Sequence, residues 1–490
     1  PEISEEEKPF ELPEGWEWVR VADLMEVING RAYKKHEMLQ TGTPLLRVGN
    51  LFTSNEWYYS DLQLDENKYI NNGDLIYAWS ASFGPFIWTG EKVIYHYHIW
   101  KLNLFAEEYS NKYFIYDFLL SITDKIKSQG NGIAMLHMTK EKMEQQIIAL
   151  PPINEQQQIV RKIRELTVLC DQLEQQSLTS LDAHQQLVET LLGTLTDSQN
   201  AEELAENWAR ISEHFDTLFT TEASVDALKQ TILQLAVMGK LVPQDPNDEP
   251  AENLFNRLCI TRNLSLQNQL ENKEADIMLR KIKKTKPATP PFKLPENWIC
   301  TNLIEICEYL VDCHNKTAPY VDAGIPIIRT TNIRNRNFQE QDLKFVNKET
   351  YEFWSRRCTP QPGDIIFTRE APMGEALIIP PNVQWCLGQR TMLIRVMHEF
   401  ISNEFILLAL TEPLLLERAS KHAVGLTVKH LRVGDVETLN IPLPPLNEQY
   451  RIVAKVKILL SLCDKAQKKI KSAQQTQLHL ADALTDAAIN

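Results

Sequence analysis

Side chains that can hydrogen-bond to the edges of DNA bases gather in turn-prone stretches in the second half of this 490-residue chain. Arginine and lysine suit guanine, asparagine and glutamine suit adenine, and lysines and hydroxyls suit phosphates. The densest group follows a β-like run and comprises Arg329, Thr330, Asn332, Arg334, Asn335 and Arg336. Further candidates are Arg369, Glu370, Gln389, Arg390, Lys429 and His430. These residue types offer the chemistry of nucleic-acid recognition.

The first half of the chain carries candidates at the corresponding places. They are Arg47, Asn50, Trp79, Ser80, Ser82, His137 and Lys140, with a basic and aromatic patch at Tyr33, Lys34, Lys35 and His36. An arginine that occurs in both halves, such as Arg47 and its match Arg329, could equally bridge its own domain, and Trp79 could equally be a core residue. Positions that differ between the halves are better specificity candidates. By that criterion the strongest are Arg334, Arg336, Arg369 and Glu370.

Motifs with the spacing of a catalytic centre are missing from the sequence. There is no GxxxxGK[ST] loop for nucleotide phosphates, and the nearest match to the Asn-Pro-Pro-aromatic loop of a methyltransferase, residues 289–292, lacks the asparagine. His96 and His98 have the spacing of alternate strand residues, which mostly serves packing. A zinc ribbon needs closer spacing than that of Cys300, Cys307, Cys313 and His314. We expect no catalytic residue, no metal site and no cofactor.

The composition indicates a cytoplasmic chain of two to four domains. Lysine and arginine total 51 against 65 aspartates and glutamates, and the net charge of −14 argues against a protein that coats DNA indiscriminately. The eight cysteines form no CxxC pair, which fits a reducing compartment. No apolar run has the length of a membrane span, and residues 1–10 do not resemble a signal peptide.

Five short sequences recur in the same order in both halves of the chain. LPEGW at residues 12–16 recurs as LPENW 282 positions later, and PLLRVGN at 44–50 recurs as PIIRTTN at the same offset. NGDLIYAWSASFG at 72–84 matches PGDIIFTREAPMG at an offset of 290. LPPINEQ at 150–156 recurs as LPPLNEQ at an offset of 293 residues, and VLCDQ around Cys170 recurs as SLCDK at the same offset. The slowly growing offset predicts two homologous halves with small insertions.

In each half, short β-branched and aromatic runs precede a long helix. Asn154 and Asn447 occupy the N-cap positions of these helices. The apolar stripe of the first helix consists of Ile159, Ile163, Leu166, Leu169, Leu173, Leu181, Val188, Leu191 and Leu195. That of the second consists of Ile452, Val456, Leu459, Cys463, Ala466, Ile470 and Ala473. Such long stripes predict a partner helix, which the other repeat offers; alternatively, each helix packs only on its own domain.

We therefore predict an α+β chain with an internal pseudo-twofold repeat. Two mixed, mostly-β domains alternate with long helices that pair as an antiparallel coiled coil. The predicted borders are 1–150 for the first β domain, 151–290 for a central helical region with its linker, 291–442 for the second β domain and 443–490 for the distal helix. The charge run at 281–286 is expected to be solvated.

The sequence resembles the specificity subunits of type I restriction-modification enzymes. The resemblance is carried by LPxxW, by the Gly-Asp turn with its apolar strand, by LPPxNEQ with its helix, and by LKQTILQLAVMGKLVPQDPNDEPAENL in the middle. It implies two target-recognition domains, each of which contacts one half of a split site in double-stranded DNA. It also implies helical spacers that dock two methyltransferase subunits and, through them, the restriction and translocation subunits.

Two further expectations concern the spacing and the N-terminus. A helix of about 40 residues is roughly 60 Å long and could hold two half-sites more than one turn of DNA apart. Because the loops of the β domains differ, the full target should be asymmetric. The leader that precedes LPENW suggests that an equivalent helical segment is missing before Pro1.

Two rival interpretations remain open on the sequence alone. The first is a methyltransferase or nuclease that carries its own recognition domains, and it requires catalytic motifs that this sequence lacks. The second is a non-cleaving scaffold or decoy homologue that binds methyltransferase subunits.

Overall fold

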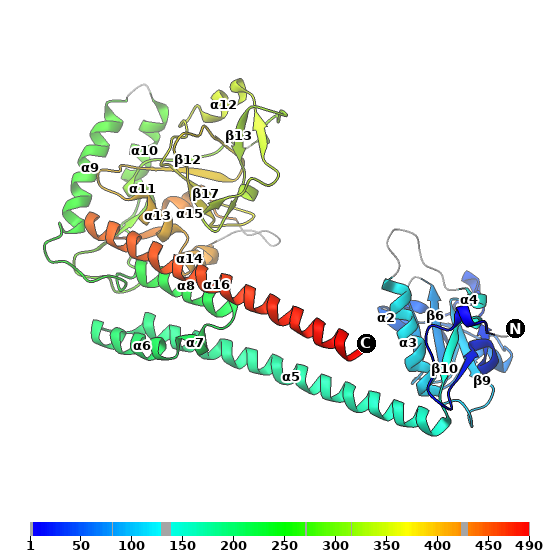
Figure 1. Ribbon diagram of the computed structural model, residues 1–490. Helices are drawn as coiled ribbons and strands as arrows, with labels where there is room; N and C mark the ends of the chain where they lie inside the picture. Colours follow the sequence, from blue (N-terminus) through cyan, green and yellow to red (C-terminus); the bar gives the residue numbers. More distant parts are fainter. Residues whose placement is uncertain are drawn as a thin grey trace. The chain divides into compact units, whose positions relative to one another are not determined.

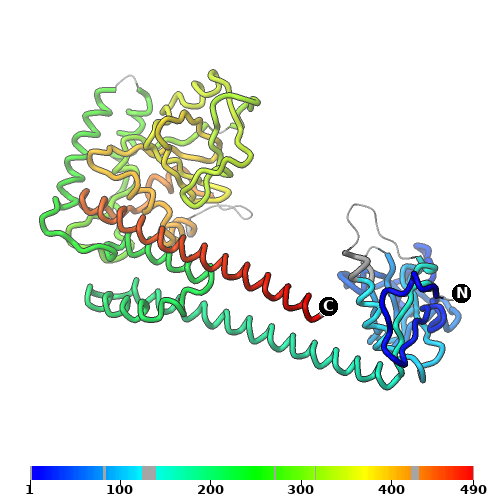
Figure 2. Tube along the Cα trace, viewed as in Figure 1, coloured from blue at the N-terminus to red at the C-terminus, as the bar shows by residue number. Residues whose placement is uncertain are grey.

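The computed structural model describes residues 3–80, 82–128, 139–269, 272–314, 316–422 and 430–489 (Figure 1). The chain divides into two compact units, Pro1–Leu178 and Thr179–Asn490. Helix α5 (Ile153–Asp197) runs from the first unit into the second, as the Cα trace shows (Figure 2). Two of the candidate residues, His137 and Lys429, lie outside the described residues.

The first unit contains two four-stranded sheets and a two-stranded ribbon. One sheet has the order β2-β9-β6-β7, and all its neighbouring strands are antiparallel. The other has the order β4-β3-β8-β5, in which β3 and β8 are parallel. The strands are β2 (Met25–Asn29), β3 (Thr43–Leu46), β4 (Tyr58–Ser60), β5 (Tyr69–Ile70), β6 (Leu75–Ser80), β7 (Ser82–Ile87), β8 (Val93–Tyr95) and β9 (Ile99–Leu104). Helix α3 (Lys112–Ser128) packs on β7.

The second unit repeats this topology. The sheet β12-β20-β17-β18 corresponds to β2-β9-β6-β7, and β16-β13-β19 corresponds to β4-β3-β8, again with one parallel pair. The strands are β12 (Cys307–Asp312), β13 (Ile325–Ile328), β16 (Lys344–Val346), β17 (Ile365–Thr368), β18 (Ala376–Ile378), β19 (Cys386–Leu387) and β20 (Thr391–Val396). An additional hairpin joins β14 (Ile333–Arg334) to β15 (Asn337–Phe338). The predicted α+β fold with an internal repeat is confirmed.

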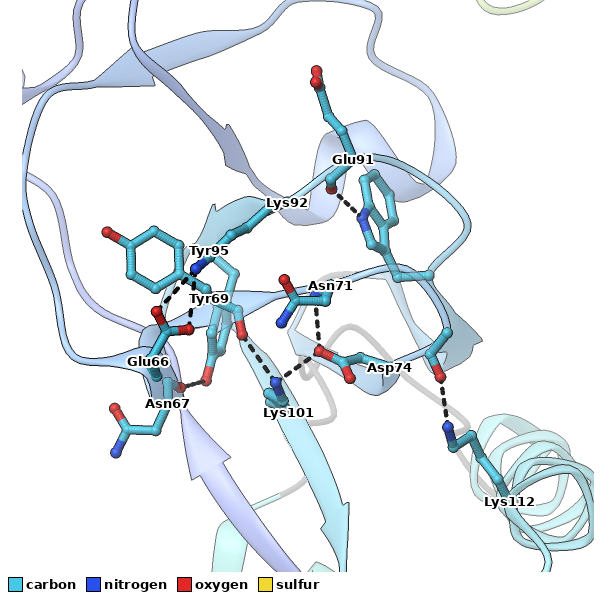
Figure 3. A network of polar contacts seen from close by, with 12 residues as sticks. Glu66, Asn67, Tyr69, Asn71, Asp74, Glu91, Lys92, Tyr95, Lys101 and Lys112 are labelled. Atoms are coloured by element: carbon cyan, nitrogen blue, oxygen red, sulfur yellow. Dashed lines mark hydrogen bonds and ion pairs between the residues drawn. The ribbon is translucent and has the colours of Figure 1, made fainter.

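The Gly-Asp turn builds the same structure in both copies. Gly73 and Gly363 have φ values of 87° and 92°, which glycine adopts without strain. The Asp74 carboxylate accepts a hydrogen bond from the Asn71 backbone N–H (2.7 Å) and pairs with Lys101 of β9 (2.7 Å), as Figure 3 shows. In the second unit, Asp364 accepts from the Gln361 N–H (2.8 Å) and pairs with Arg395 of β20 (2.7 Å). The repeated aspartate is therefore structural.

Both ends of each β domain meet at the root of a long helix. Strand β1 (Glu17–Arg20) pairs with β10 (Ile147–Leu150), and β11 (Ile299–Asn302) pairs with β21 (Asn440–Leu443). The tryptophan of LPxxW lies just before the first strand of each ribbon, and the glutamate of NEQ lies just after the second. The Trp16 indole N–H donates to Glu155 (3.1 Å), and that of Trp298 donates to Glu448 (3.0 Å). We call this Trp–Glu contact, with the neighbouring glutamine, the root latch.

The glutamine of NEQ completes the root latch with its buried amide. The Gln156 oxygen accepts from the Asn111 N–H (2.7 Å), and its NH2 donates to the Pro151 carbonyl (2.8 Å). Gln449 repeats both bonds, from the Ser402 N–H (2.8 Å) and to the Pro444 carbonyl (3.0 Å). Because both glutamine side chains are fully buried, these bonds satisfy backbone groups that water cannot reach.

The distal helix α16 (Leu446–Ile489) packs along α8 (Glu222–Val237) in the second unit (Figure 1). Lys229 pairs with Asp464 (2.7 Å), and Lys471 pairs with Glu222 (3.1 Å). Residue numbers rise along one helix as they fall along the other, so the two helices are antiparallel. An antiparallel helix pair was expected, but the partner that covers this part of α16 is α8, whose role the sequence did not predict.

The apolar stripe of α5 is buried in one part of the helix and exposed to solvent in another. Val188 and Leu195 are fully buried in the core of the second unit together with α6 (Ala201–Glu213) and α8. From residue 161 to residue 183, every side chain of α5 is exposed. The pairing of this segment with α16 stays a prediction.

The hairpin of α9 (Ala251–Gln267) and α10 (Lys273–Lys284) packs against the second β domain. Arg262 of α9 is buried and donates to the Glu305 carbonyl. Glu274 of α10 forms a bidentate ion pair with Arg357 (2.6 and 3.1 Å). The hairpin thus lies within the predicted central region but is fixed to the β domain that follows, and the predicted domain borders stay a proposal.

The root latch predicts unequal effects of removing its indole N–H. Trp298→Phe leaves Glu448, whose exposed fraction is 1%, with Gln244 as its remaining side-chain donor. Burial raises the pKa of Glu448, against the hydrogen bonds from Trp298 and Gln244. We expect Trp298→Phe to lower the free energy of unfolding by about 1–3 kcal/mol, the cost of an unsatisfied buried group. Urea unfolding measures it.

Trp16→Phe is the matched variant. Trp16 and Glu155 are only half-buried, so water can replace the lost donor and the destabilisation should be smaller. An equal loss of stability in the two variants would contradict this prediction.

Candidate nucleic-acid interface

Trp79 and Arg369 occupy matched positions where two neighbouring strands meet at one end of a sheet, β2-β9-β6-β7 in the first domain and β12-β20-β17-β18 in the second. The Trp79 N–H, near the end of β6, donates to the carbonyl of His98, which directly precedes β9 (3.1 Å). In the second domain, the Arg369 N–H after β17 donates to the carbonyl of Arg390, which directly precedes β20 (2.9 Å). The backbone is the same in both copies, but the side chains that it presents are different.

Arg369 is held by a partly buried ion pair. Its guanidinium pairs with Asp312 (2.9 Å), and the two side chains are only 13% and 18% exposed. The same guanidinium donates to the Leu431 carbonyl (3.0 Å). Burial raises the pKa of Asp312, and Arg369 opposes that shift. Arg369 therefore fixes the strand end and presents little of its guanidinium to a ligand.

Arg390 presents a more open guanidinium at the same strand end. Its side chain is 53% exposed and pairs with Glu370 (3.2 Å). Its φ is 67°, in the left-handed region that non-glycine residues adopt at a cost. Non-glycine residues in such strained positions cluster at functional sites, where the surrounding structure holds them. Glu370 also forms a backbone bridge with His430.

The β14–β15 hairpin brings a third arginine to this region. Arg334 pairs with Asn337 across the hairpin, so Asn335 and Arg336 form a two-residue turn with φ values of 50° and 65°. Such turns favour Asn-Gly, and here arginine replaces the glycine. Among the described residues, the buried Nη1 of Arg336 has no hydrogen-bond partner. Burial lowers its pKa, against the nearby carboxylate of Glu375.

Glu375 connects this hairpin to the end of β17. It accepts from the Asn335 N–H (2.7 Å), and its own N–H is bonded to Thr368 (3.0 Å). The structure thus brings one predicted set together, which we call the second interface. It consists of Arg334, Asn335, Arg336, Arg369, Glu370, Gln389 and Arg390.

The matching region of the first domain, the first interface, is aromatic. Tyr77 stacks on Trp100 (6.0 Å between ring centroids), and Trp100 stacks on Trp79 (5.6 Å). The Trp79 indole donates to the Tyr97 carbonyl (2.8 Å), and the Tyr97 ring is 39% exposed. These rings form an aromatic column that runs from the buried Tyr77 to the exposed Tyr97. Trp79 lies between the two ends, so it packs on the core and also reaches the surface.

His96 and His98 lie at the outer end of this column, with ring centroids 4.9 Å apart. Burial lowers the pKa of His96 to about 4, and His98 and Arg47 act in the same direction. His96 is therefore a neutral ring at neutral pH. Across the part of the chain that the structure describes, no group of three or more His, Cys, Asp and Glu side chains could hold a metal ion.

The arginine and asparagine of the repeated RxxN sequence hold a loop in both domains. Asn50 accepts from the Arg47 N–H (3.1 Å), as Asn332 does from that of Arg329 (3.2 Å). The Arg47 guanidinium lies over the Tyr58 ring (4.5 Å), and Arg329 pairs with Asp342 (2.9 Å). These contacts favour the internal-bridge role of the repeated arginine, and its contact with DNA stays a prediction.

The other predicted DNA-binding residues differ in how far their side chains are exposed to solvent. Ser80 and Thr330 are buried, whereas Gln389 is half-buried. The exposed candidates of the first domain are Lys34, Lys35, His36 and Lys140, while Tyr33 is buried. For Ser82 the structure describes the backbone, in β7. The side chains that the sequence analysis missed are Asp312, Glu375, Arg31, Tyr97 and His98.

The position of Arg31 in the first domain was not indicated by the sequence. It pairs with Glu37 (2.7 Å) and forms a backbone bridge with His96, which places it beside the aromatic column. In the second domain, two linked sequence differences from the first domain could have indicated the ion pair between Asp312 and Arg369. Asn29 and Trp79 of the first copy become Asp312 and Arg369 of the second, at strand positions that the register of the two sheets equates.

Comparison with known proteins identifies the family. Residues 13–183 and 295–474 match the family described as "Type I restriction modification DNA specificity domain". The EcoAI specificity subunit of Escherichia coli is 39% identical over 513 residues, which cover 100% of this chain and 85% of that protein. The EcoEI specificity subunit of Escherichia coli is 35% identical over 530 residues, with the same shares covered.

A solved structure supports the fold. A chain from a structural study of the assembly and conformational transition of a type I restriction-modification system aligns over 98% of both chains, with a TM-score of 0.54 and 16% identity. No helix among the described residues is long and apolar enough to cross a membrane. The matched segments hold the two β domains and the first parts of both long helices, so this chain belongs to the type I restriction-modification DNA specificity family, with one specificity domain in each half.

Proposed function

We propose that this chain selects the DNA site of a type I restriction-modification complex, and that each β domain reads one half of an asymmetric bipartite site. The observation that carries this proposal is the difference in side chains on a shared backbone frame. At matched strand ends the first domain presents Trp79 and His98, and the second presents Arg369 and Arg390. Two β domains that read identical half-sites would be expected to present the same side chains at these strand ends.

The second interface has the chemistry to read guanine. An arginine fork can donate two hydrogen bonds to O6 and N7 of guanine in the major groove. Arg390 is the most open of the arginines there, because its side chain is 53% exposed while that of Arg369 is 13% exposed. We assign base reading to Arg390 and the positioning of the strand end to Arg369.

The first interface offers contacts of another kind. The exposed Tyr97 ring and the neighbouring His98 can contact the methyl group of thymine or donate to base edges, and the exposed Lys34 and Lys35 can contact phosphates. Such contacts select different bases from those that an arginine fork selects. The full target is therefore asymmetric in this proposal.

The chemistry on DNA belongs to partner subunits in this proposal. The relatives are named specificity subunits of restriction enzymes. The long helices would dock two methyltransferase subunits and, through them, the restriction and translocation subunits. The eight cysteines of the chain form no disulfide in the structure, in keeping with a cytoplasmic site of action.

The first prediction from this proposal tests the function directly. Co-expression of the chain with its methyltransferase partner in a host without DNA methylation should methylate one bipartite, asymmetric sequence throughout the genome. Sequencing of modified bases measures this. A chain that methylates DNA alone would establish the enzyme alternative, and a chain that binds the methyltransferase without directing methylation would establish the scaffold alternative.

A second prediction separates base reading from folding at the second interface. Arg390→Gly should leave the melting temperature unchanged or raise it, because glycine adopts a φ of 67° without strain. Discrimination at one half-site should fall by about 10- to 100-fold, the worth of a bidentate base contact. Binding to duplexes with single substitutions in either half-site measures the effect.

Two companion variants sharpen this test. Arg390→Lys keeps the charge but not the fork, so it should lose discrimination and keep the affinity for unrelated DNA. Arg369→Ala should also affect one half-site only, with a loss of stability, because it leaves Asp312 partly buried without its counter-charge. A stable Arg390→Gly variant with unchanged discrimination would remove Arg390 from the reading residues.

A third prediction concerns the distance between the half-sites. Helix α5 contains 45 residues and is about 68 Å long at 1.5 Å per residue. Insertion of four residues into both long helices, near Leu173 and Ile470, lengthens each by about 6 Å. We expect the number of unread base pairs in the methylated sequence to change. A spacer of unchanged length in a folded variant would refute the role of the helices as a ruler.

A further inference from the structure

Three lysines form an exposed basic face on α16. Lys465, Lys468 and Lys469 are all exposed, and none of them forms an ion pair with another described residue. Two other lysines of the helix are paired, Lys457 with Glu404 (2.6 Å) and Lys471 with Glu222 (3.1 Å). These three lysines form a local basic face in a chain whose net charge is −14.

The equivalent helix of the first half lacks this charge. Cys170 aligns with Cys463, and the same offset aligns the lysines with Gln172, Gln175 and Gln176. Glutamine and lysine have similar helix propensities, so the lysines are not needed to form the helix. The two halves share the helix but not the basic face.

Lys468 of the basic face lies on the side of α16 that meets the second β domain. Lys457 reaches Glu404 of α13 (Asn403–Leu410), so this side of α16 faces the second β domain. Asp464, seven residues further along, pairs with Lys229 of α8 (2.7 Å), and its charge also raises the pKa of Arg336 against the larger effect of burial. Lys468 follows Lys457 by about three helical turns and therefore projects from the same side of α16 as Lys457. Lys465 and Lys469 continue the face away from α8.

We propose that Lys465, Lys468 and Lys469 contact the phosphates of DNA that flanks the second half-site, independently of sequence. This inference rests on the proposed function and adds the path of the DNA beyond the bases that are read. Lysines at positions i, i+3 and i+4 lie within about 6 Å along the helix. Double-stranded DNA carries one charge per about 1.7 Å of its axis, so all three ammonium groups can find a phosphate in that length.

The test uses the full chain and two duplexes, one with the target identified by methylation sequencing and one with the same bases shuffled. The variant is K465Q/K468Q/K469Q, which gives α16 the side chains that α5 already has. We expect affinity for both duplexes to fall together while the preference for the target is kept. The slope of log K against log salt should become less steep by roughly two to three, since each phosphate contact contributes about 0.9.

The matched control is K283Q/K284Q/K286Q, which removes three exposed lysines at the end of α10, in the same unit. Its salt slope should equal that of the unmodified chain. An equal change in both variants would show an effect of net charge alone and would overturn the inference. A wild-type chain without preference for the target would contradict the proposed function instead.

Two other outcomes would assign the lysines to another partner. A lower melting temperature with an unchanged salt slope would show that they pair with carboxylates of this chain. Loss of the complex with the methyltransferase, again with an unchanged slope, would place them in a protein interface. Either result would overturn the DNA contact.

Discussion

The root latch is the constraint on which the rest of the structure depends. A β domain that begins and ends at the same point could swing about its two connections. The paired ribbon, the Trp–Glu bond and the buried glutamine amide instead fix both connections to the first turn of the long helix. The glutamate also lies at a helix N-terminus, where the helix dipole favours a negative charge. The orientation of each β domain relative to the first turn of its long helix is therefore set at the root latch.

The two copies share the contacts that stabilise the fold and differ in the side chains at their strand ends. The Gly-Asp turn, the RxxN loop and the root latch have the same hydrogen bonds in both halves. At the strand ends, however, a change in one side chain requires a change in its neighbour. Arg369, only 13% exposed, needs the Asp312 carboxylate, whereas Trp79 needs only the Tyr97 carbonyl for its indole N–H. A reading surface can thus vary, provided that its buried partners vary with it.

The sequence predicted the repeat, the two β domains and both long helices, because these features leave periodic or recurring signals. It could not predict the contacts that join distant positions. The Trp298–Glu448 bond spans 150 residues, and the recurrence of LPxxW with NEQ was the one available sign of it. The pairing of α16 with α8 was missed because α8 has only 16 residues and so a short stripe. Arg369 ranked high because it differs from Trp79, but a difference in sequence does not tell a guanidinium that faces solvent from one that is held by a carboxylate.

The ion pairs at the second interface give a physical reason for an acidic protein to read DNA. An arginine that is already paired, as Arg390 is with Glu370 and Arg369 with Asp312, gains little from a phosphate, since that contact must replace an existing one. A guanine edge that accepts two hydrogen bonds in fixed geometry can compensate for the lost pair, and an arbitrary backbone contact cannot. Under the proposed role of Arg390, the Glu370 carboxylate beside it therefore weakens binding to unrelated sequences more than binding to the target. In our proposal, Lys465, Lys468 and Lys469 of α16 then supply attraction to the DNA backbone that the paired arginines do not provide.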